Sequence, residues 1–225
     1  MPAYFYPDWW NTPNNWTRMC GAMNRSGGPS TAVMNPNSGP GAAANPDYTG
    51  AIAGCHASGQ QVIGYVHTSY GARASATVRS EIDAYYAFYP GIDGIFLDEM
   101  STDPATRSYY RPLYQYVRGK PGPHAVVGNP GVAAASAWQL TTPVADAVIV
   151  FEGTAAAYAR WSPPSWVRAR PASSIANLVY STPAAAMGQV CSSSKAKNAG
   201  YMYVTDDVLP NPWDTLPAGT SWSCR

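Results

Sequence analysis

The sequence is poor in charged residues. Only 12% of its 225 residues are Asp, Glu, Lys or Arg, whereas an ordinary soluble domain carries about 25%. The formal net charge is +1, so the protein has no strong field with which to gather nucleic acid or anionic lipid. These values argue against a nucleic-acid-binding protein and against a protein that acts on a membrane surface.

Long apolar runs and several common site motifs are also missing. No apolar run approaches the roughly 18 residues that span a bilayer, so we expect no membrane insertion. The chain has no Cys-x-x-Cys pair, and its three histidines lack zinc spacing. We therefore expect no metal site and no cofactor. The Gly-x-Ser-x-Gly sequence of many serine hydrolases is absent too.

Apolar, turn-forming and aromatic residues are plentiful instead. Hydrophobic residues make up 46% of the chain, enough for one sizeable core. The 20 Gly and 21 Pro predict many turns. The 8 Trp and 16 Tyr have rings with a polar atom and suit stacking on sugars. We expect a single domain over residues 1–225 and a monomer.

Four cysteines are spread through the chain, at Cys20, Cys55, Cys191 and Cys224. Two disulfides, and hence an exported protein, are the favoured interpretation, and four buried thiols are the alternative. Four cysteines allow three pairings. We favour Cys20–Cys55, which joins the first two predicted helices, and Cys191–Cys224. The chain shows no signal peptide, so we expect a mature extracellular domain with an added start Met.

Short, β-rich apolar runs recur about every 28 residues along the chain. The eight predicted strands are Ala3–Tyr6, Thr31–Met34, Gln61–Val66, Asp93–Leu97, Ala125–Gly128, Ala147–Phe151, Ile175–Tyr180 and Gly200–Val204. Helical patterns fill most intervals, as in the apolar face of Val78, Ile82, Tyr85, Tyr86 and Tyr89. This alternation predicts an α/β fold, a small (β/α)8 barrel of the TIM type with short loops. A doubly wound open sheet is the alternative.

Four capping residues stand directly before a proline and predict helix starts: Thr12, Asn45, Asp103 and Thr182. The side-chain oxygen of such a residue accepts a hydrogen bond from an N–H of the first turn. The proline that follows lacks an N–H that the first turn would leave unpaired anyway.

The active site of a (β/α)8 barrel lies where its strands end. Six of the 13 carboxylates follow predicted strands: Asp8, Asp98, Glu99, Glu152, Asp206 and Asp207. In a chain with so few charges, this placement predicts an acidic site. The residues that we expect to contact substrate there are Asp8, Trp9, Asn35, Asn37, His67, Tyr70, Asn129, Tyr180 and Asp206.

Glycoside hydrolysis needs two carboxyl groups, one on each side of the sugar bond. Asp98 or Glu99, together with Glu152, supplies such a pair from the fourth and sixth strands. We expect them within about 5–10 Å, a range that includes both stereochemical classes. Neighbours in a strand point to opposite faces, so we expect Asp98 to face the barrel mouth and Glu99 to orient a neighbour or contact substrate.

Each of these residues also has a purely structural interpretation. Asp98 and Glu99 could cap a helix or form surface ion pairs, and Glu152 could pair with an arginine. Asp206 and the adjacent Asp207 could form a turn, and His67 could be a hydrogen-bonded residue rather than a base. Trp9 and Trp10 could belong to the core instead of forming a stacking platform.

Four segments together resemble the spherulin-4-like proteins, which include glycoside hydrolase family 135, whose fungal members cut galactosaminogalactan. They are Asn35–Gly41, Gly64–Gly71, Asp93–Glu99 and Val148–Glu152, the last matching a family strand that ends in Glu. The resemblance runs in order from residue 1 to about residue 205. It is specific because the segments occur together.

The resemblance implies a (β/α)8 fold and endo-acting cleavage of α-1,4-linked N-acetylgalactosamine in a polysaccharide such as galactosaminogalactan or the Pel polymer. It carries over an acidic trio to Asp98, Glu99 and Glu152. By analogy with α-retaining barrels, Asp98 is the nucleophile, Glu152 the general acid/base and Glu99 a supporting residue. An acidic groove also favours a partly deacetylated, cationic polymer. The alternatives are a non-catalytic glycan-binding or spore-coat protein and a glycosidase of another linkage.

Overall fold

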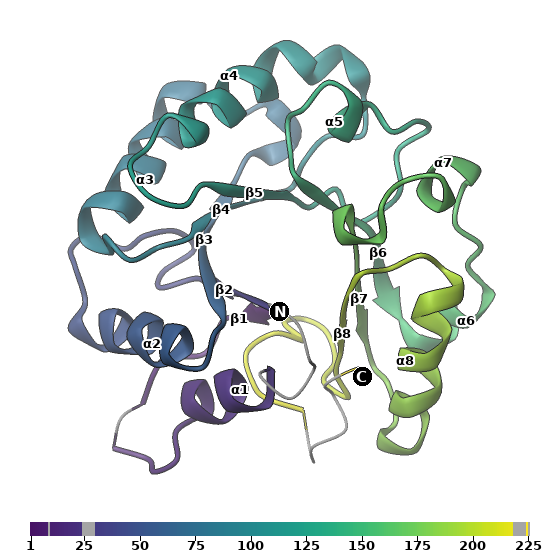
Figure 1. Cartoon of the computed structure of the whole chain (residues 1–225), viewed down its shortest axis with the longest axis horizontal. Helices are drawn as coiled ribbons and strands as arrows, with labels where there is room; N and C mark the ends of the chain where they lie inside the picture. The colour runs from purple at the N-terminus through teal and green to yellow at the C-terminus, as the bar shows by residue number, and fades with distance from the viewer. Residues whose placement is uncertain (9, 24–29, 218–223, 225) are drawn as a thin grey trace.

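The computed structural model describes residues 1–8, 10–23, 30–217 and 224. Eight strands form one sheet in sequence order, and all neighbouring strands are parallel. Figure 1 shows the sheet curved into a ring with the helices on its outer side. The strands are β1 Pro2–Ala3, β2 Thr31–Met34, β3 Gln61–His67, β4 Gly94–Asp98, β5 Ala125–Gly128, β6 Ala147–Thr154, β7 Ile175–Tyr180 and β8 Tyr201–Val204.

Helices connect each strand to the next. They are α1 Asn15–Met23, α2 Pro46–Ala57, α3 Ser75–Phe88, α4 Arg107–Arg118, α5 Trp138–Thr141, α6 Ala155–Arg160, α7 Ser165–Arg168 and α8 Met187–Ala196. Short 3-10 turns precede several of these elements, at Ser69–Gly71, Pro104–Thr106, Ala172–Ser174 and Ala184–Ala186.

The predicted α/β fold with eight parallel strands is confirmed. The hydrogen-bonded order runs from β1 to β8, and among the described residues no ladder joins β8 back to β1. The loop after β8 lies at this seam, where the Tyr4 N–H donates to the Trp213 carbonyl at 2.9 Å. Closure of the sheet into a TIM-type barrel stays a prediction.

Two of the four predicted helix caps are present. The side chains of Asn45 and Asp103 each accept a hydrogen bond, at 2.9 Å, from the backbone N–H two residues further on. The prediction for Thr12 is wrong, because α1 begins later and Asn14 caps it. The prediction for Thr182 is wrong as well, because its hydroxyl donates to the Tyr180 carbonyl instead.

The outer helices pack tightly on the sheet. Of the predicted apolar face, Val78, Ile82 and Tyr85 are buried in α3, Tyr86 is half-buried, and Tyr89 is buried directly after the helix. The Tyr85 ring fills the space beside Gly64, where a Cβ atom would come within 2.6 Å of the ring. The Cys20–Cys55 disulfide joins α1 to α2. The Cys191–Cys224 disulfide joins α8, the helix after β7, to the C-terminal segment. Both pairings are the favoured ones.

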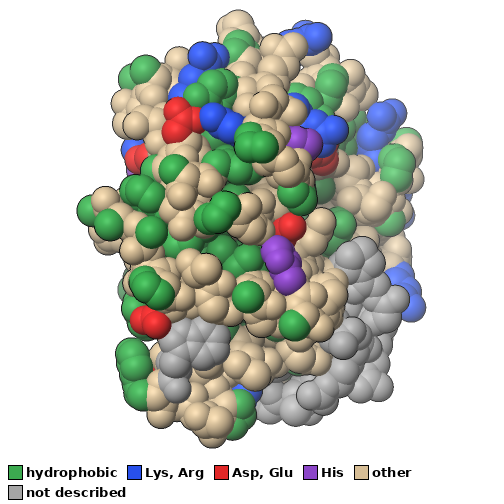
Figure 2. Space-filling model, turned by 60° about the vertical axis from the view of Figure 1, so that its left-hand side comes forward, with side chains coloured by type: hydrophobic (Ala, Val, Ile, Leu, Met, Phe, Trp, Pro, Cys, Tyr) green, Lys and Arg blue, Asp and Glu red, His purple; other side chains and the backbone are tan. Residues whose placement is uncertain are grey.

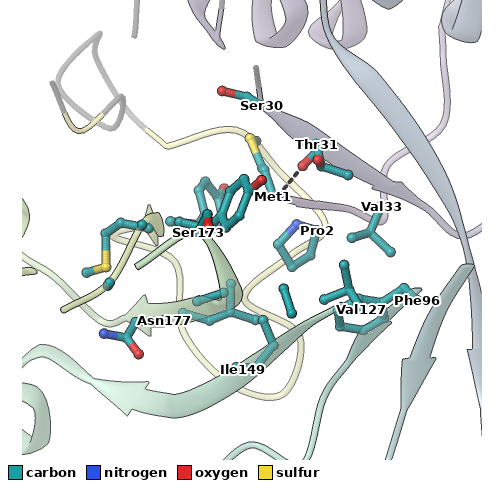
Figure 3. Close-up of a pocket in the computed structure, with 18 of the residues that line it drawn as sticks. Met1, Pro2, Ser30, Thr31, Val33, Phe96, Val127, Ile149, Ser173 and Asn177 are labelled. Atoms are coloured by element: carbon teal, nitrogen blue, oxygen red, sulfur yellow. Dashed lines mark hydrogen bonds between the residues drawn. The ribbon is translucent and has the colours of Figure 1, made fainter. Parts of the chain in front are cut away.

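A cavity of about 400 Å³ lies inside the sheet at the N-terminal ends of the strands. Figure 3 shows Pro2, Val33, Phe96 and Val127 around it, and the hydrogen bond from the Met1 amine to the Thr31 carbonyl. Phe96 lies two residues before Asp98, and Val127 lies two residues before Asn129, so these polar residues stand further along the same strands, toward their C-terminal ends. The cavity and the carboxylates therefore occupy opposite ends of the same interior.

The surface reflects the charge-poor composition. On the face drawn in Figure 2, charged side chains are scattered among apolar and uncharged polar atoms. In the part of the chain that the structure describes, no helix is both long and apolar enough to cross a bilayer.

The entry to β4 is fixed by Asp93 and Gly94. The buried Asp93 carboxylate accepts from the Val62 N–H at 2.7 Å, and His56 Nε2 lies 2.8 Å from the same oxygen. A Cβ atom on Gly94 would lie 2.0 Å from the Ala125 carbonyl oxygen of β5. The two backbones approach so closely that only glycine fits.

We predict that Gly94→Ala lowers the free energy of unfolding by about 3 kcal/mol or more, because backbone atoms cannot move aside. Gly54→Ala is the matched control, since a Cβ there meets nothing within 4 Å. Gly54 lies in α2, and this change should raise the free energy of unfolding by about 0.5–1 kcal/mol. Urea unfolding measures both, and equal effects would refute the close approach.

Candidate active site

The interior face of the sheet follows from its register. Because Gly64 faces the helices, its neighbour Tyr65 faces the interior. Tyr65 pairs with Phe96 of β4, which pairs with Val127 of β5. Two residues further along, Asp98 and Asn129 therefore point to the same interior, at the C-terminal ends of their strands. The expectation that Asp98 shares a face with Phe96 agrees with this register.

Glu152 reaches the interior through a β-bulge. In the pairing of β6 with β7, Ile149 lies opposite Ala176, but Phe151 already lies opposite Asn177. One extra residue on β6 shifts the alternation, as bulges do. Phe151 then packs on the outer helix residues Tyr158 and Trp161. Glu152 consequently turns toward Asp98 and Asn129.

The Asn129 side chain connects the two carboxylates. Its Nδ2 atom donates to Asp98 Oδ1 and to Glu152 Oε2, both at 2.8 Å. Its Oδ1 atom accepts from the Gly131 N–H at 2.9 Å, which fixes the orientation of the amide. The two carboxylate oxygens therefore lie within two hydrogen-bond lengths of each other. Asn129 is only 8% exposed, so water competes little for these bonds.

Burial makes both carboxylates hard to ionise. Desolvation raises the pKa of Asp98, while hydrogen bonds from Tyr65, from the Glu99 N–H and from Asn129 oppose the rise. Desolvation raises the pKa of Glu152 as well. There the Asp98 charge raises the pKa further, and hydrogen bonds from Asn129 and Trp213 lower it.

Glu99 contributes through its backbone conformation. Its φ is 50°, in the left-handed region that a Glu rarely adopts. Ser69 and Tyr70, on the neighbouring loop after β3, have φ values of 46° and 56°. The Tyr70 N–H donates to the Glu99 carbonyl at 2.7 Å, so the strained positions support one another. Strain of this kind, about 1–3 kcal/mol for each residue, is typical of functional sites.

A buried chain of hydrogen bonds holds this segment from behind. The Ser101 N–H donates to the Tyr110 hydroxyl at 2.9 Å, and this hydroxyl lies 2.9 Å from Thr68 Oγ1. Thr68 Oγ1 in turn lies 2.8 Å from the Glu99 carbonyl and 3.0 Å from that of Asp98. Since carbonyls only accept, Thr68 donates to them and Tyr110 donates to Thr68. Thr68 and Tyr110 are fully buried.

The contact residues predicted after the first two strands lie on the loops that follow β1 and β2. Asp8 accepts a hydrogen bond from the Asn11 side chain. The side-chain Oδ1 of Asn35 accepts from the Gly39 N–H at 2.9 Å and shapes its loop, and Asn37 is exposed beside it. Trp9 lies outside the described residues.

The other predicted contacts also lie at the ends of the strands. Arg73 donates to the His67 carbonyl at 3.0 Å, and the same nitrogen lies 3.4 Å from His67 Nδ1, so the role of the His67 side chain stays a prediction. The Tyr70 ring is 62% exposed. Tyr180 packs edge-on against Trp213 at 6.1 Å. Asp206 lies in a bend two residues after the end of β8 and is half-buried.

Sequence reasoning missed three residues of the site. Tyr65 and Trp213 donate to Asp98 and Glu152. Tyr4 lies close enough that both carboxylates raise the pKa of its hydroxyl, after the larger effect of burial. Alternation in β3 could have placed Tyr65 inside, whereas the irregular segment around Trp213 offers no pattern. Among the described residues, no group of three or more His, Cys, Asp or Glu could hold a metal.

Comparison with known proteins gives consistent results. Residues 1–224 match the model of spherulation-specific family 4. Spherulin-4 of Physarum polycephalum is 33% identical over 217 residues, which cover 92% of this chain and 62% of that protein. The chain thus spans less than two thirds of this curated relative.

A crystal structure of Sph3 from Aspergillus clavatus in complex with GalNAc has the same fold. It superposes with a TM-score of 0.78 at 25% identity and covers 97% of this chain and 92% of that one.

Glu152→Gln tests the electrostatic cost of the site. Because the pKa of Glu152 in the folded protein lies above the unfolded value, stability falls as the pH rises through this window. Gln removes the buried charge, so we expect Tm to rise by about 2–4 °C at pH 7. The gain should shrink below the ordinary Glu pKa of 4.5. The control Glu81→Gln, which loses its ion pair with Arg73, should give no gain. A gain that is independent of pH would contradict this account.

Tyr110→Phe tests the buried hydrogen-bond chain. The change leaves the Ser101 N–H without its acceptor and removes the donor to the Thr68 hydroxyl, so we expect a loss of about 1–3 kcal/mol in unfolding free energy. The control is Tyr86→Phe, whose hydroxyl bonds the Pro123 carbonyl near the surface and should matter little. Chemical denaturation compares the two variants, and equal losses of unfolding free energy would show that the buried hydrogen bonds of Tyr110 have no special role.

Proposed function

The chain belongs to spherulation-specific family 4, and on this premise we propose that it is an endo-acting glycoside hydrolase. Its substrate would be an α-1,4-linked polymer of N-acetylgalactosamine and galactosamine, such as galactosaminogalactan or the Pel polymer. The observation that carries the proposal is the pair of buried carboxylates joined by one amide. The similar Sph3 structure, which contains GalNAc, supports the class of sugar.

The separation of the carboxylates favours retention of the anomeric configuration. Retaining enzymes place their two carboxyl groups about 5–5.5 Å apart, and inverting enzymes place them about 6.5–9.5 Å apart. The two oxygens that share one amide nitrogen at 2.8 Å lie at most two hydrogen-bond lengths apart, which is close to the retaining separation.

The hydrogen-bond donors around each carboxylate support different roles for the two. Asp98 receives three donors, from Tyr65, the Glu99 N–H and Asn129, which favour its ionised form, while burial and the Glu99 charge oppose it. Glu152 receives two, from Asn129 and Trp213, and the Asp98 charge opposes its ionisation. The charge of each carboxylate influences the other, so their titrations are coupled. On these grounds we propose Asp98 as the nucleophile and Glu152 as the acid, with Glu99 in a supporting role.

The reaction then follows in two displacements. An Asp98 oxygen bonds to the anomeric carbon while the glycosidic C–O bond breaks, and Glu152 gives its proton to the leaving oxygen. In the second step, Glu152 takes a proton from a water molecule whose oxygen attacks the anomeric carbon. The bond to Asp98 breaks, and both carboxyl groups return to their starting states.

The exposed apolar side chains support glycan binding at the same end of the sheet. In the part of the chain that the structure describes, every large exposed hydrophobic residue lies on a loop that follows a strand. These residues are Tyr6, Trp10, Tyr70, Val132, Val208 and Leu209. Exposed apolar groups around a polar centre are typical of binding sites. We call this end of the molecule, with the loops that follow the strands, the rim.

Two finer features belong to the proposal. The two disulfides support export from the cell, because disulfides persist in oxidising compartments. We also propose that the sheet is a (β/α)8 barrel, in which the loop that carries Trp213 covers the seam between β8 and β1. The hydrogen bond from Tyr4 to Trp213 across that seam supports this arrangement.

A non-catalytic glycan-binding protein is the second candidate. The exposed aromatic residues of the rim favour it as much as they favour an enzyme, since stacking alone binds sugars. The match to spherulin-4 is consistent with it as well. Only turnover separates the two candidates.

We predict that the wild-type protein releases reducing ends from α-1,4-linked galactosaminogalactan. Asp98→Asn and Glu152→Gln should each lower the rate at least about 100-fold, the size of a lost acid/base or nucleophile. Asp83→Asn is the matched control, because Asp83 pairs with Lys120 on the outer helix α3 and its loss should leave the rate unchanged.

Product mass spectra and a reducing-end assay measure these rates. Binding of the polymer without release by any variant would favour the glycan-binding candidate. Neither binding nor release would show that the polymer is wrong.

A further inference from the structure

We propose that the stacked rings of Tyr6 and Trp10 form a second sugar-binding subsite, which holds a neutral pyranose unit away from the bond that is cleaved. The inference rests on the proposed function and extends it, because it assigns a ligand to a surface that the reaction itself does not use. It concerns the loop after β1 and the N-terminus of α2.

The two rings form one aromatic surface. Their centroids are 6.1 Å apart and their planes differ by 22°. Tyr6 is 42% and Trp10 is 75% exposed, so broad ring faces remain in contact with solvent. A pyranose has a face of C–H groups that matches such a surface, while its hydroxyl groups point outward from the ring edge. Aromatic side chains of this kind combine apolar area with a polar atom.

The surface is held in place before any ligand arrives. The Tyr6 hydroxyl donates to the Asp47 carboxylate and accepts from Asn45 Nδ2 at 3.0 Å. The Tyr6 ring also packs edge-on against Tyr48, which is buried in the core, at 5.5 Å. A preorganised ring loses little freedom on binding. Asn45 and Asp47 also place polar atoms at the ring edge, where sugar hydroxyls would lie.

The subsite lies close to the carboxylates but is distinct from them. Tyr4 lies near Asp98, since its ring packs edge-on against Tyr65 at 5.4 Å and Tyr65 donates to Asp98. From Tyr4 the chain reaches Tyr6 in two residues, at most about 7 Å between Cα atoms. A polymer whose cleaved bond lies between Asp98 and Glu152 can therefore extend onto these rings. A short oligomer at the carboxylates would leave them uncovered.

The recognition of a neutral ring predicts a particular salt dependence. Stacking depends on apolar contact, so its contribution should change little with ionic strength. An ammonium sugar held by carboxylates would bind more weakly as salt increases. The two kinds of contact are therefore separable in one titration series.

The experiment measures binding of α-1,4-linked N-acetylgalactosamine oligomers by calorimetry in the Glu152→Gln protein, which binds without turnover. Trp10→Ala in this background should weaken binding of an eight-unit oligomer about three- to tenfold. Binding of a two-unit oligomer should stay the same. Trp10→Phe, which keeps a ring, should restore most of the affinity, and the loss should be equal at low and high salt.

Tyr114→Ala is the matched control, because it removes an aromatic ring from the outer helix α4. The inference is overturned if Trp10→Ala has no effect on the long oligomer, if it weakens both oligomers equally, or if Tyr114→Ala has the same effect. It is also overturned if the loss disappears at high salt. If the parent Glu152→Gln protein binds no oligomer at all, the proposed function fails, and the inference fails with it.

Discussion

The candidate site depends on one side-chain amide. Asn129 has two N–H groups on one nitrogen, and it gives one to each of two carboxylates that would otherwise repel each other. Its oxygen is held by the Gly131 N–H, and the Gly131 carbonyl accepts from the Glu152 N–H at 2.8 Å. The amide therefore sets both the separation of the two carboxylates and the backbone position of one of them. The proposed roles of Asp98 and Glu152 rest on that geometry.

The surrounding structure is built to hold this pair under strain. Glu99 adopts a left-handed conformation directly after Asp98, and a buried chain through Tyr110 and Thr68 keeps it there. Burial raises the pKa of both carboxylates, which costs stability at neutral pH. Native proteins accept such costs at functional sites and recover the stability elsewhere. Here the tightly packed helices and the two disulfides lie away from the rim.

The sequence predicts the strands better than the site. Alternating β-rich runs and helical patterns locate seven of the eight strands, and β2, β5 and β7 have the predicted bounds. The first strand, predicted at Ala3–Tyr6, is observed at Pro2–Ala3. The inward orientation of Asp98 follows from simple alternation. The inward orientation of Glu152 does not, because it requires a β-bulge, and the sequence of β6 gives no signal for the extra residue. Long-range contacts escape prediction for the same reason, as when the loop after β8 brings Trp213 to Glu152.

The two ends of the interior differ in character. The N-terminal ends of the strands enclose an apolar cavity, whereas the C-terminal ends carry Asp98, Asn129, Glu152 and the exposed aromatic rings. Parallel strands permit this division because all of them end on the same side. Charge is scarce in this chain, and the two buried carboxylates with their shared amide are what make the C-terminal end chemically distinct.

The most direct test of this account is an NMR titration of the side-chain carboxyl carbons in the wild-type protein and in Asp98→Asn. The account predicts that Asp98 and Glu152 titrate above the ordinary carboxyl range in the wild type. In Asp98→Asn the pKa of Glu152 should fall, because the neighbouring charge that raises it is gone. Two ordinary and independent titrations in the wild type would contradict the central claim, since carboxylates that share one buried amide cannot ionise independently.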